Sequence, residues 1–190
     1  MVKLDDKDKK GPVPLNALDP FTFFASFNPP TTDSKPIATL YRMRQFFDLE
    51  FEAPTDFDGI PTADNQQSWF FPYAIDRDQD DTPSLWTLAR QAIEGGRDAI
   101  NPGVFDRCLG IKTVKSGKLS SGLFWLRPRA FLPVDSRSKA YLRDHGIEVP
   151  NKLTSWSHYV KVLDDTTQVL GDDFPALSLA AYSHKGPAAE

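Results

Sequence analysis

The sequence predicts a mainly α-helical fold with room for a few short strands, and two observations lead to this class. Several segments carry apolar residues at helical spacing behind a capping residue and end near a glycine. The chain also holds 16 prolines among its 190 residues, which predicts short elements joined by rigid connections. We therefore expect a single compact domain over residues 15–183 with long proline-rich connections, between a disordered leader (1–14) and a flexible tail (184–190).

The first half of the domain is expected to hold two helices separated by a long loop. Ser34 can cap a helix over about residues 35–47, because the apolar residues there fall on one face at helical spacing. Residues 50–73 are rich in proline, aspartate and aromatic residues without a clear period, which predicts an ordered loop with room for one short strand. A threonine-proline pair favours the start of a second helix over about residues 82–93, and two glycines can close it.

The second half is expected to begin with three short helices. The pattern predicts the first near residues 103–109 and the second near residues 119–126. Asp135 or Ser136 can cap the third, which should stop at Gly146 because glycine adopts a left-handed backbone conformation at little cost.

The clearest helical pattern of the chain begins at Thr154 and ends at Gly171. Its largely apolar residues recur every three or four positions, which is the spacing of one helix face. Most of the large aromatic residues of the chain should join the core that this face contacts, since aromatic side chains dominate core burial. The stripe consists of Trp156, Tyr159, Val160, Leu163, Thr167 and Leu170.

Composition and targeting signals exclude several classes of protein. The chain is 40% hydrophobic and has 14 Phe and 4 Trp, which is typical of a folded domain with a large core. Its single cysteine, Cys108, excludes an internal disulfide and a cysteine-based zinc cluster. The charged N-terminus and the lack of any run of 18 apolar residues predict a soluble, cytoplasmic protein with no membrane partner.

Two short motifs resemble cofactor sites without meeting their requirements. DRDQDD at residues 76–81 has Asp81 and Thr87 at the sixth and twelfth positions, where a calcium loop needs glycine and glutamate. SGKLSS at residues 116–121 lacks the first glycine and the Ser or Thr after the lysine that a phosphate-binding loop needs. The histidines are scattered, with no partner at ligand spacing. We therefore expect no cofactor and no bound metal.

The charge of the chain is distributed unevenly. Residues 106–144 hold nine cations against three anions, a formal charge of +6, so the remainder carries −10 within a total of −4. A basic segment in an acidic protein is either the footprint of a polyanion or an ordinary solvated face. The charge pattern alone leaves both interpretations open.

Three blocks of residues occur together in a known family. They are DPFTFFASFN at 19–28, PTDFDGIP at 54–61 with WFF at 69–71, and LFWLRP at 123–128 leading into FLPVDSR at 131–137. Over about residues 19–180 the chain resembles the region that precedes the AAA+ motor of McrB-type proteins, the GTP-driven component of modification-dependent restriction systems. The motor is not part of this sequence. Pro29-Pro30 replace the basic residue and glycine that continue the first block in the family, so no phosphate contact carries over there.

The resemblance implies a DNA-binding module that recognises base-modified DNA in a restriction and defence system, with an AAA+ GTPase and a nuclease subunit as partners. Such a module would be non-enzymatic by itself. Trp125 or Trp69 can supply base stacking, although core packing is the simpler role for both. The cations that we expect to contact phosphates, which position a protein without reading sequence, are Lys112, Lys115, Lys118, Arg127, Arg129, Arg137 and Lys139.

Two alternatives stay open beside the DNA-binding module. The Pro-Val-Asp that leads into a basic helix at Asp135 also resembles helix-hairpin-helix DNA glycosylases, which implies Asp135 as a catalytic carboxylate. The Gly-x-Gly of that hairpin is absent, however, and a helix cap is the simpler explanation of Asp135. The second alternative is a protein-interaction domain, whose acidic remainder docks a motor or nuclease partner.

Overall fold

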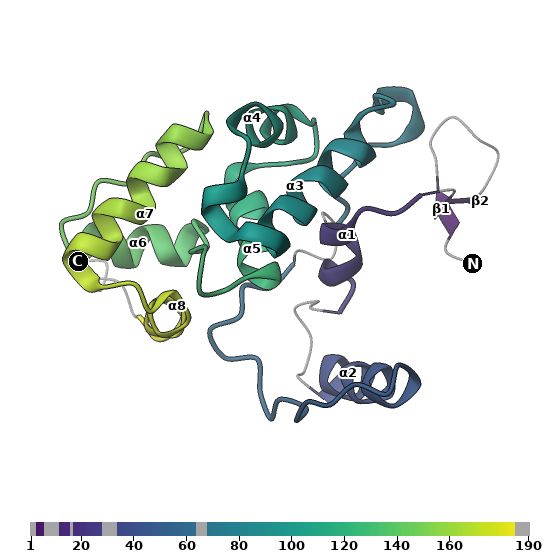
Figure 1. The fold of residues 1–190 in the computed structure, drawn as a ribbon, viewed down its shortest axis with the longest axis horizontal. Coiled ribbons are helices and arrows are strands. Elements are labelled where there is room, and N and C mark those ends of the chain that lie inside the picture. The colour runs from purple at the N-terminus through teal and green to yellow at the C-terminus, as the bar shows by residue number, and fades with distance from the viewer. Residues whose placement is uncertain (1–2, 6–11, 16, 28–33, 64–67, 185–190) are drawn as a thin grey trace, which may run out of the picture.

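The computed structural model describes residues 3–5, 12–15, 17–27, 34–63 and 68–184, and most of this part of the chain is helical. The expected mainly α class is confirmed (Figure 1). The 3₁₀ turns η1 (Ala74–Asp76) and η2 (Gly96–Ala99) flank α3, and strands β1 (Lys3–Asp5) and β2 (Pro12–Pro14) pair antiparallel. The α-helices are α1 (Pro20–Ala25), α2 (Ser34–Phe46), α3 (Asp81–Gly95), α4 (Pro102–Gly110), α5 (Ser116–Leu126), α6 (Ser136–Asp144), α7 (Trp156–Leu170) and α8 (Phe174–Ser183).

The helices other than α2 pack around one core, and each of them contacts one or more neighbouring helices. Helix α3 packs against α1, α4 and α5, helix α4 packs against α7, and α6 packs against α8. Figure 1 shows α3, α4 and α5 at the centre, α6, α7 and α8 on one side, and α2 set apart below α1. The buried apolar residues form one continuous cluster that runs from α1 to α8.

Both ends of the chain contain segments that lie outside the described residues. The predicted leader, residues 1–14, includes the short pair β1 and β2, and its other residues are not described. Of the predicted tail, only His184 is described, and its Nε2 lies 2.7 Å from Oδ2 of Asp144.

Two helices, α1 and α8, were not expected from the sequence. Asp19 caps α1 through a 2.9 Å hydrogen bond from the Thr22 backbone N–H, and Asp173 caps α8 through one from Ala176. In both helices a proline occupies the first or second position. The same combination of cap and proline signals a helix start elsewhere in the chain, so a local signal for both helices was present.

The other predicted helices form with shifted ends. Helix α5 begins three residues earlier than expected, at Ser116. Helix α7 is capped by Ser155, whose hydroxyl accepts a hydrogen bond from the His158 backbone N–H, so Thr154 is not its first residue. The segment 50–73 contains no strand in its described residues, and its backbone is irregular.

An aromatic stack joins α4, α7 and the segment before α6. The ring of Phe105 lies parallel to that of Tyr159 at 5.7 Å between centroids, and Phe131 also stacks on Tyr159. The Tyr159 hydroxyl donates a 2.7 Å hydrogen bond to the Leu132 carbonyl, and burial raises the pKa of this tyrosine. These contacts fix the chain just before α6.

The core-facing stripe of α7 differs from the prediction in its second half. Trp156, Tyr159 and Leu163 are buried as expected, but Thr167 is exposed and Thr166 is buried instead. The Thr166 hydroxyl donates a 2.6 Å hydrogen bond to the Val162 carbonyl, so this polar group is satisfied inside the core.

A close approach of α1 to α5 positions the segment around Phe70. A Cβ atom on Gly122 would lie 2.6 Å from Cδ1 of Phe21, so only glycine allows this spacing. Phe21 stacks on Phe70 at 5.3 Å, and the Phe70 backbone N–H donates to the Thr22 hydroxyl. The irregular segment is thereby held against α5, where it forms one wall of a pocket.

Candidate functional site

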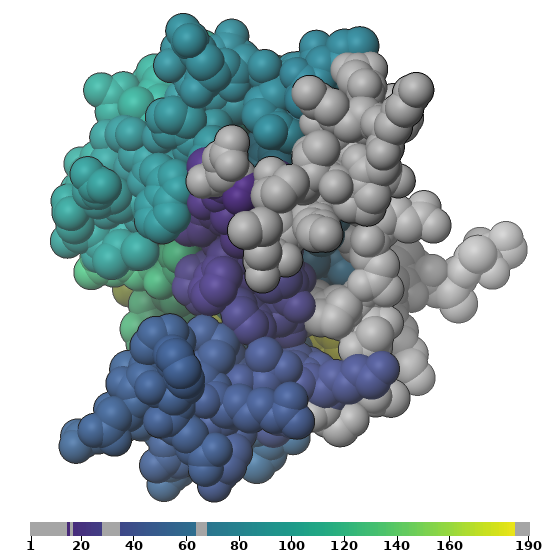
Figure 2. All heavy atoms as spheres, turned by 90° about the vertical axis from the view of Figure 1, so that its right-hand side faces the viewer, coloured from purple at the N-terminus to yellow at the C-terminus, as the bar shows by residue number. Residues whose placement is uncertain are grey.

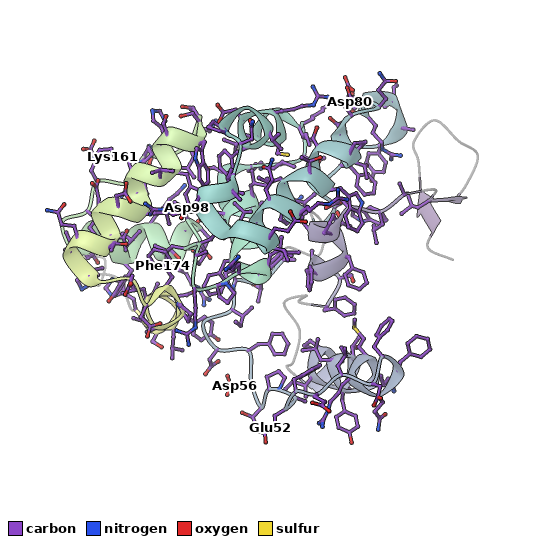
Figure 3. All side chains as sticks on the ribbon, viewed as in Figure 1. Glu52, Asp56, Asp80, Asp98, Lys161 and Phe174 are labelled. Atoms are coloured by element: carbon purple, nitrogen blue, oxygen red, sulfur yellow. The ribbon has the colours of Figure 1, made fainter. Side chains whose placement is uncertain are left out.

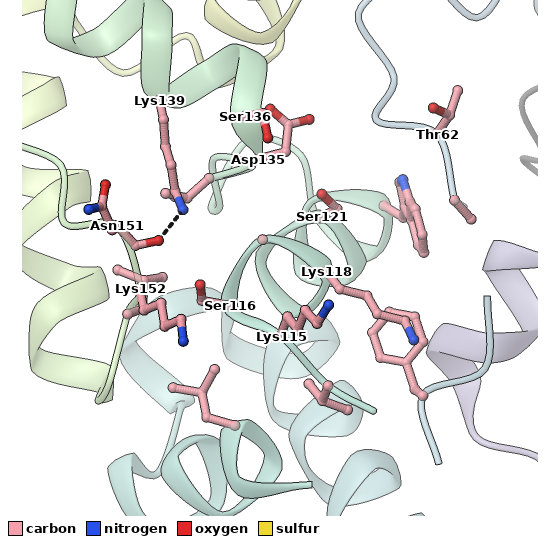
Figure 4. Close-up of a pocket in the computed structure, with 18 residues that line it drawn as sticks. Thr62, Lys115, Ser116, Lys118, Ser121, Asp135, Ser136, Lys139, Asn151 and Lys152 are labelled. Carbon is pink, nitrogen blue, oxygen red and sulfur yellow. Dashed lines mark hydrogen bonds between the residues drawn. The ribbon is translucent and has the colours of Figure 1, made fainter. Parts of the chain in front are cut away.

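A pocket of about 600 Å³ opens where the first turns of α5 and α6 meet two connecting segments. Its walls come from α5, from the start of α6, from residues 151–153 before α7, and from the segment that contains Thr62 and Phe70. Figure 4 shows its polar side chains converging from these separate parts of the chain. The pocket is lined by four lysines, Lys115, Lys118, Lys139 and Lys152.

The first turn of α5 gives the pocket positive character from the backbone as well. Lys115 is the N-cap residue, its side chain makes no capping hydrogen bond, and the first turn contains no acidic residue. The backbone N–H groups of a first helical turn have no partner within the helix, and the helix dipole favours a negative charge near them. This end of α5 therefore adds to the field of the lysines.

The four lysines differ in how they are held. The Lys118 ammonium donates to the carbonyls of Trp69 and Thr113 and lies 4.7 Å from the centroid of the Phe70 ring. The Lys139 ammonium donates a 2.6 Å hydrogen bond to the Asn151 carbonyl. Burial, with a smaller effect of Arg143, lowers the pKa of Lys139.

Lys115 and Lys152 are exposed at the pocket rim, and neither has a hydrogen-bond or ion-pair partner among the residues that the structure describes. Lys115 stands on α5, and Lys152 stands on the connection between α6 and α7. Their ammonium groups are therefore available to an incoming anion.

Two serines also line the pocket. Ser116 is 9% exposed and Ser121 is 6% exposed (Figure 4). Their hydroxyls are not among the enclosed polar atoms that lack a hydrogen-bond partner, which in the described residues are Asp19 Oδ2, Arg77 Nη2 and Thr113 Oγ1. Both hydroxyls can therefore reach a ligand in the pocket, but neither is an unsatisfied group of the core.

Asp135 is the single carboxylate among the described residues that line the pocket. Its Oδ1 accepts a 2.9 Å hydrogen bond from the Ser138 backbone N–H, and Asp135 is thus the N-cap of α6, as the sequence indicated. The remainder of its side chain lies beside Ser136 and Ser121 in the pocket (Figure 4).

The two tryptophans considered for base stacking lie in different places. Trp125 lines the pocket, its indole N–H donates to the Pro61 carbonyl at 2.9 Å, and its ring meets Phe70 at 6.3 Å. Trp69 does not line the pocket, and its ring packs edge-on against Phe71 at 5.3 Å. Trp125 is therefore the tryptophan that a ligand in the pocket can contact.

The other predicted phosphate contacts lie outside this pocket. Lys112 forms a 2.7 Å ion pair with Asp76, and the Arg127 guanidinium donates to the Ile93 carbonyl at the end of α3. Arg129 is exposed after α5 and has no partner among the described residues. The basic segment therefore does not form one uniform surface.

Arg137 lines an adjoining cavity of about 260 Å³, with its guanidinium over the Tyr182 ring. That cavity shares Thr62, Asp135 and Ser136 with the lysine-lined pocket. Arg137 therefore extends the basic surface beyond the pocket.

Sequence reasoning missed Lys152 and the two serines. Lys152 lies outside the basic segment 106–144, and the fold brings it to the pocket through the connection between α6 and α7. Ser116 and Ser121 belong to the SGKLSS motif, which does not meet the requirements of a phosphate-binding loop. No local signal distinguishes a serine that faces a pocket from one that faces the core.

Other chemistry finds no support in the described part of the chain. It contains no group of three or more His, Cys, Asp or Glu side chains that could hold a metal ion. Cys108 is fully buried, and burial raises the pKa of its thiol to about 12, so it is not a reactive nucleophile. None of the described helices combines the length and apolar character needed to cross a membrane.

A second hollow lies between α1 and α3 and is almost purely apolar. It has a volume of about 540 Å³, and the partly exposed rings of Phe23, Phe24 and Trp86 line it together with Ile93. Figure 2 looks onto this side of the molecule, with α1 between α3 above and α2 below. Phe23 and Phe24, expected in the core, are thus surface residues.

Comparison with known proteins identifies a family for the chain. A family model described as a domain of unknown function (DUF8425) matches residues 1–184. No curated protein and no solved structure matches the chain.

Proposed function

The chain belongs to the DUF8425 family, a domain of unknown function, and from its own residues we propose that it is a DNA-binding module. The observation that carries the proposal is the convergence of Lys115, Lys118, Lys139 and Lys152 from three separate segments on one pocket. Lysines that neutralise phosphates supply most of the affinity in non-specific DNA binding. A site with four ammonium groups and one carboxylate suits a polyanion better than a neutral or cationic ligand.

The adjoining surface supports an extended contact. Arg137 lies in the neighbouring cavity, which shares Thr62, Asp135 and Ser136 with the pocket. A duplex that follows this surface would contact the lysine rim and Arg137 in turn. Lys112 and Arg127 contribute less in this proposal, because neither lines the pocket and the charge of Lys112 is already paired with the Asp76 carboxylate.

The resemblance to McrB-type proteins supports a finer proposal. In that proposal the DNA carries modified bases, the module acts in a cytoplasmic restriction and defence system, and an AAA+ GTPase and a nuclease are its partners. The apolar hollow between α1 and α3 favours a protein partner beside the DNA, since exposed apolar patches mark interaction sites.

The test is a titration of duplex DNA, followed by fluorescence anisotropy at several salt concentrations. Affinity should fall steeply as salt rises, with a logarithmic slope of about −0.9 for each neutralised phosphate. The double variant Lys115→Glu/Lys152→Glu should bind weakly and show a shallower slope, by about one for each phosphate that is no longer neutralised. Lack of binding by the unmodified protein at low salt would contradict the proposal.

The matched control is Lys161→Glu. Lys161 projects from α7 (Figure 3), does not line the pocket, and forms an exposed ion pair with Asp165. Reversing the charge of Lys161 changes the net charge of the protein by the same amount as each reversal in the double variant. An equal loss of affinity for each reversed charge would mean that overall charge, and not the pocket, determines binding.

The glycosylase alternative is favoured by one observation, that the Asp135 carboxylate lines the same pocket as the lysines. A carboxylate beside a bound nucleotide can stabilise positive charge that develops on a sugar. Asp135→Asn separates an enzyme from a binding module, because an amide caps a helix but does not stabilise that charge.

A further inference from the structure

The lysine-lined pocket has two chemically different ends. At one end Ser116, Lys139 and Lys152 lie together, with Lys115 between them and the middle of the pocket (Figure 4). At the other end the partly exposed Trp125 ring lies edge to face against the buried Phe70 ring, over which the Lys118 ammonium is held by carbonyl oxygens. A ligand that fills the pocket therefore meets two cations that no described residue pairs at one end and the Trp125 ring at the other.

The cationic end offers donors that the protein does not use. Lys115 and Lys152 have no partner among the described residues, and Ser116 lines the same end of the pocket (Figure 4). The set of unused donors is the one that a phosphate, with several acceptor oxygens, can satisfy.

Asp135 limits where an anion can bind. Its carboxylate stands beside Ser136 and Ser121 on the α6 side of the pocket, away from Lys152 (Figure 4). A phosphate would be repelled from this position and attracted to the end that holds Lys115, Ser116 and Lys152. The middle of the pocket, where the carboxylate can accept hydrogen bonds, suits a sugar hydroxyl better than a phosphate.

We propose that the pocket binds one nucleoside monophosphate unit, with its phosphate on Lys115, Ser116 and Lys152 and its base against Trp125. This inference rests on the proposed function and names the part of the nucleic acid that enters the site. The volume of about 600 Å³ falls within the range typical of small-molecule sites and is too small for a duplex. The unit is either the phosphorylated end of a strand or a free mononucleotide.

The experiment is isothermal titration of the whole chain with deoxyadenosine 5′-monophosphate, deoxyadenosine and inorganic phosphate. The mononucleotide should bind at least about tenfold more tightly than either fragment, because only it contacts both ends of the pocket. The double variant Lys115→Ala/Lys152→Ala should lose about tenfold or more in affinity for the mononucleotide. Lys161→Ala should leave that affinity unchanged.

Ser116→Ala provides a second, less disruptive variant at the phosphate end. The Ser116 hydroxyl makes no hydrogen bond within the described part of the chain, so the variant should keep the melting temperature of the unmodified protein and still bind the mononucleotide several-fold more weakly. Mononucleotide binding that is absent, or that is unaffected by both the lysine and the serine variants, overturns the inference.

A competition experiment distinguishes a strand end from a free nucleotide as the ligand. It also distinguishes failure of the pocket inference from failure of the DNA-binding proposal. A single strand with a 5′-phosphate that outcompetes the same strand with a 5′-hydroxyl identifies a strand end, whereas equal competition with strong mononucleotide binding identifies a free nucleotide. Closed circular duplex DNA that binds while the mononucleotide does not would defeat the pocket inference and leave the DNA-binding proposal standing. Mononucleotide binding without any DNA binding would defeat the proposed function instead.

Discussion

The two faces of helix α5 use the same kind of residue for opposite purposes. On the core face, the Ser120 hydroxyl donates to the Gly117 carbonyl at 3.0 Å and accepts from the Val134 backbone N–H at 2.8 Å. On the pocket face, the neighbouring Ser121 lines the cavity, and its hydroxyl makes no hydrogen bond within the described part of the chain. A buried hydroxyl with its bonds made stabilises the fold, whereas a hydroxyl that opens onto a pocket can bond a ligand.

The largest loss of stability in this comparison of the two faces is expected on the core face, at Leu123. This side chain is fully buried, so Leu123→Ala should reduce the free energy of unfolding by about 3–5 kcal/mol through lost burial and the cavity left behind. Urea denaturation measures the change. Val169→Ala on the exposed side of α7 is the control and should change stability by less than about 0.5 kcal/mol.

The next effect compares the adjacent serines directly. Ser120→Ala should cost about 1–3 kcal/mol, because it leaves the buried Val134 N–H without an acceptor. Ser121→Ala should change the free energy of unfolding by less than about 0.5 kcal/mol, because no hydrogen bond is removed. Urea denaturation of both variants measures the two changes in the free energy of unfolding. Equal losses would show that Ser121 is bonded within the folded protein and would remove the contrast between the two faces.

A smaller effect tests the third side of α5, which faces α1. Gly122→Ala should destabilise the protein by about 1–2 kcal/mol, because the added Cβ meets the buried Phe21 ring at 2.6 Å and this clash outweighs the better helix propensity of alanine. Gly110→Ala at the end of α4 meets no atom within 4 Å and is the control. Thermal melts should therefore show a lower melting temperature for Gly122→Ala and an unchanged or higher one for Gly110→Ala.

The comparison also shows which parts of the fold the sequence could predict. Helices with a clear apolar stripe or a cap, such as α3 and α7, were predicted to within a few residues of their ends. Helix α8 was missed although Asp173 and a following proline signal its start, because it is apolar nearly all round and shows no helical period. In α7 the buried threonine is Thr166 and not the predicted Thr167, because tertiary packing decides which of the two faces the core and residue spacing alone does not.

The candidate site was predictable only in part. Charge clustering pointed to Lys115, Lys118 and Lys139, which do line one pocket. The same clustering also selected Lys112 and Arg127, whose protein partners, Asp76 and the Ile93 carbonyl, are distant in sequence and cannot be deduced from it. The position of Lys152 depends on how the connection before α7 packs, and the orientation of Ser121 depends on how α5 packs. Neither could be predicted from a local sequence pattern.

A modest effect on stability is expected at Asp135, at the point where the pocket meets α6. Asp135→Ala should cost about 1 kcal/mol through loss of the cap to the Ser138 N–H, whereas Asp135→Asn keeps an acceptor oxygen and should stay within about 1 kcal/mol of the unmodified protein. DNA binding by the Asn variant should be nearly unchanged. Thermal melts and anisotropy titrations check both expectations.

The same substitution decides between a binding module and a glycosylase. A catalytic carboxylate must stabilise positive charge on a sugar or activate a water, and an amide does neither, although it caps a helix well. Release of a base from modified duplex DNA should therefore be measured for the unmodified protein and for Asp135→Asn at equal DNA occupancy. We expect release from neither, because the cap alone accounts for the position of Asp135. Release that is seen with the aspartate and abolished with the asparagine would make the domain an enzyme, with its carboxylate acting in the pocket that the lysines surround.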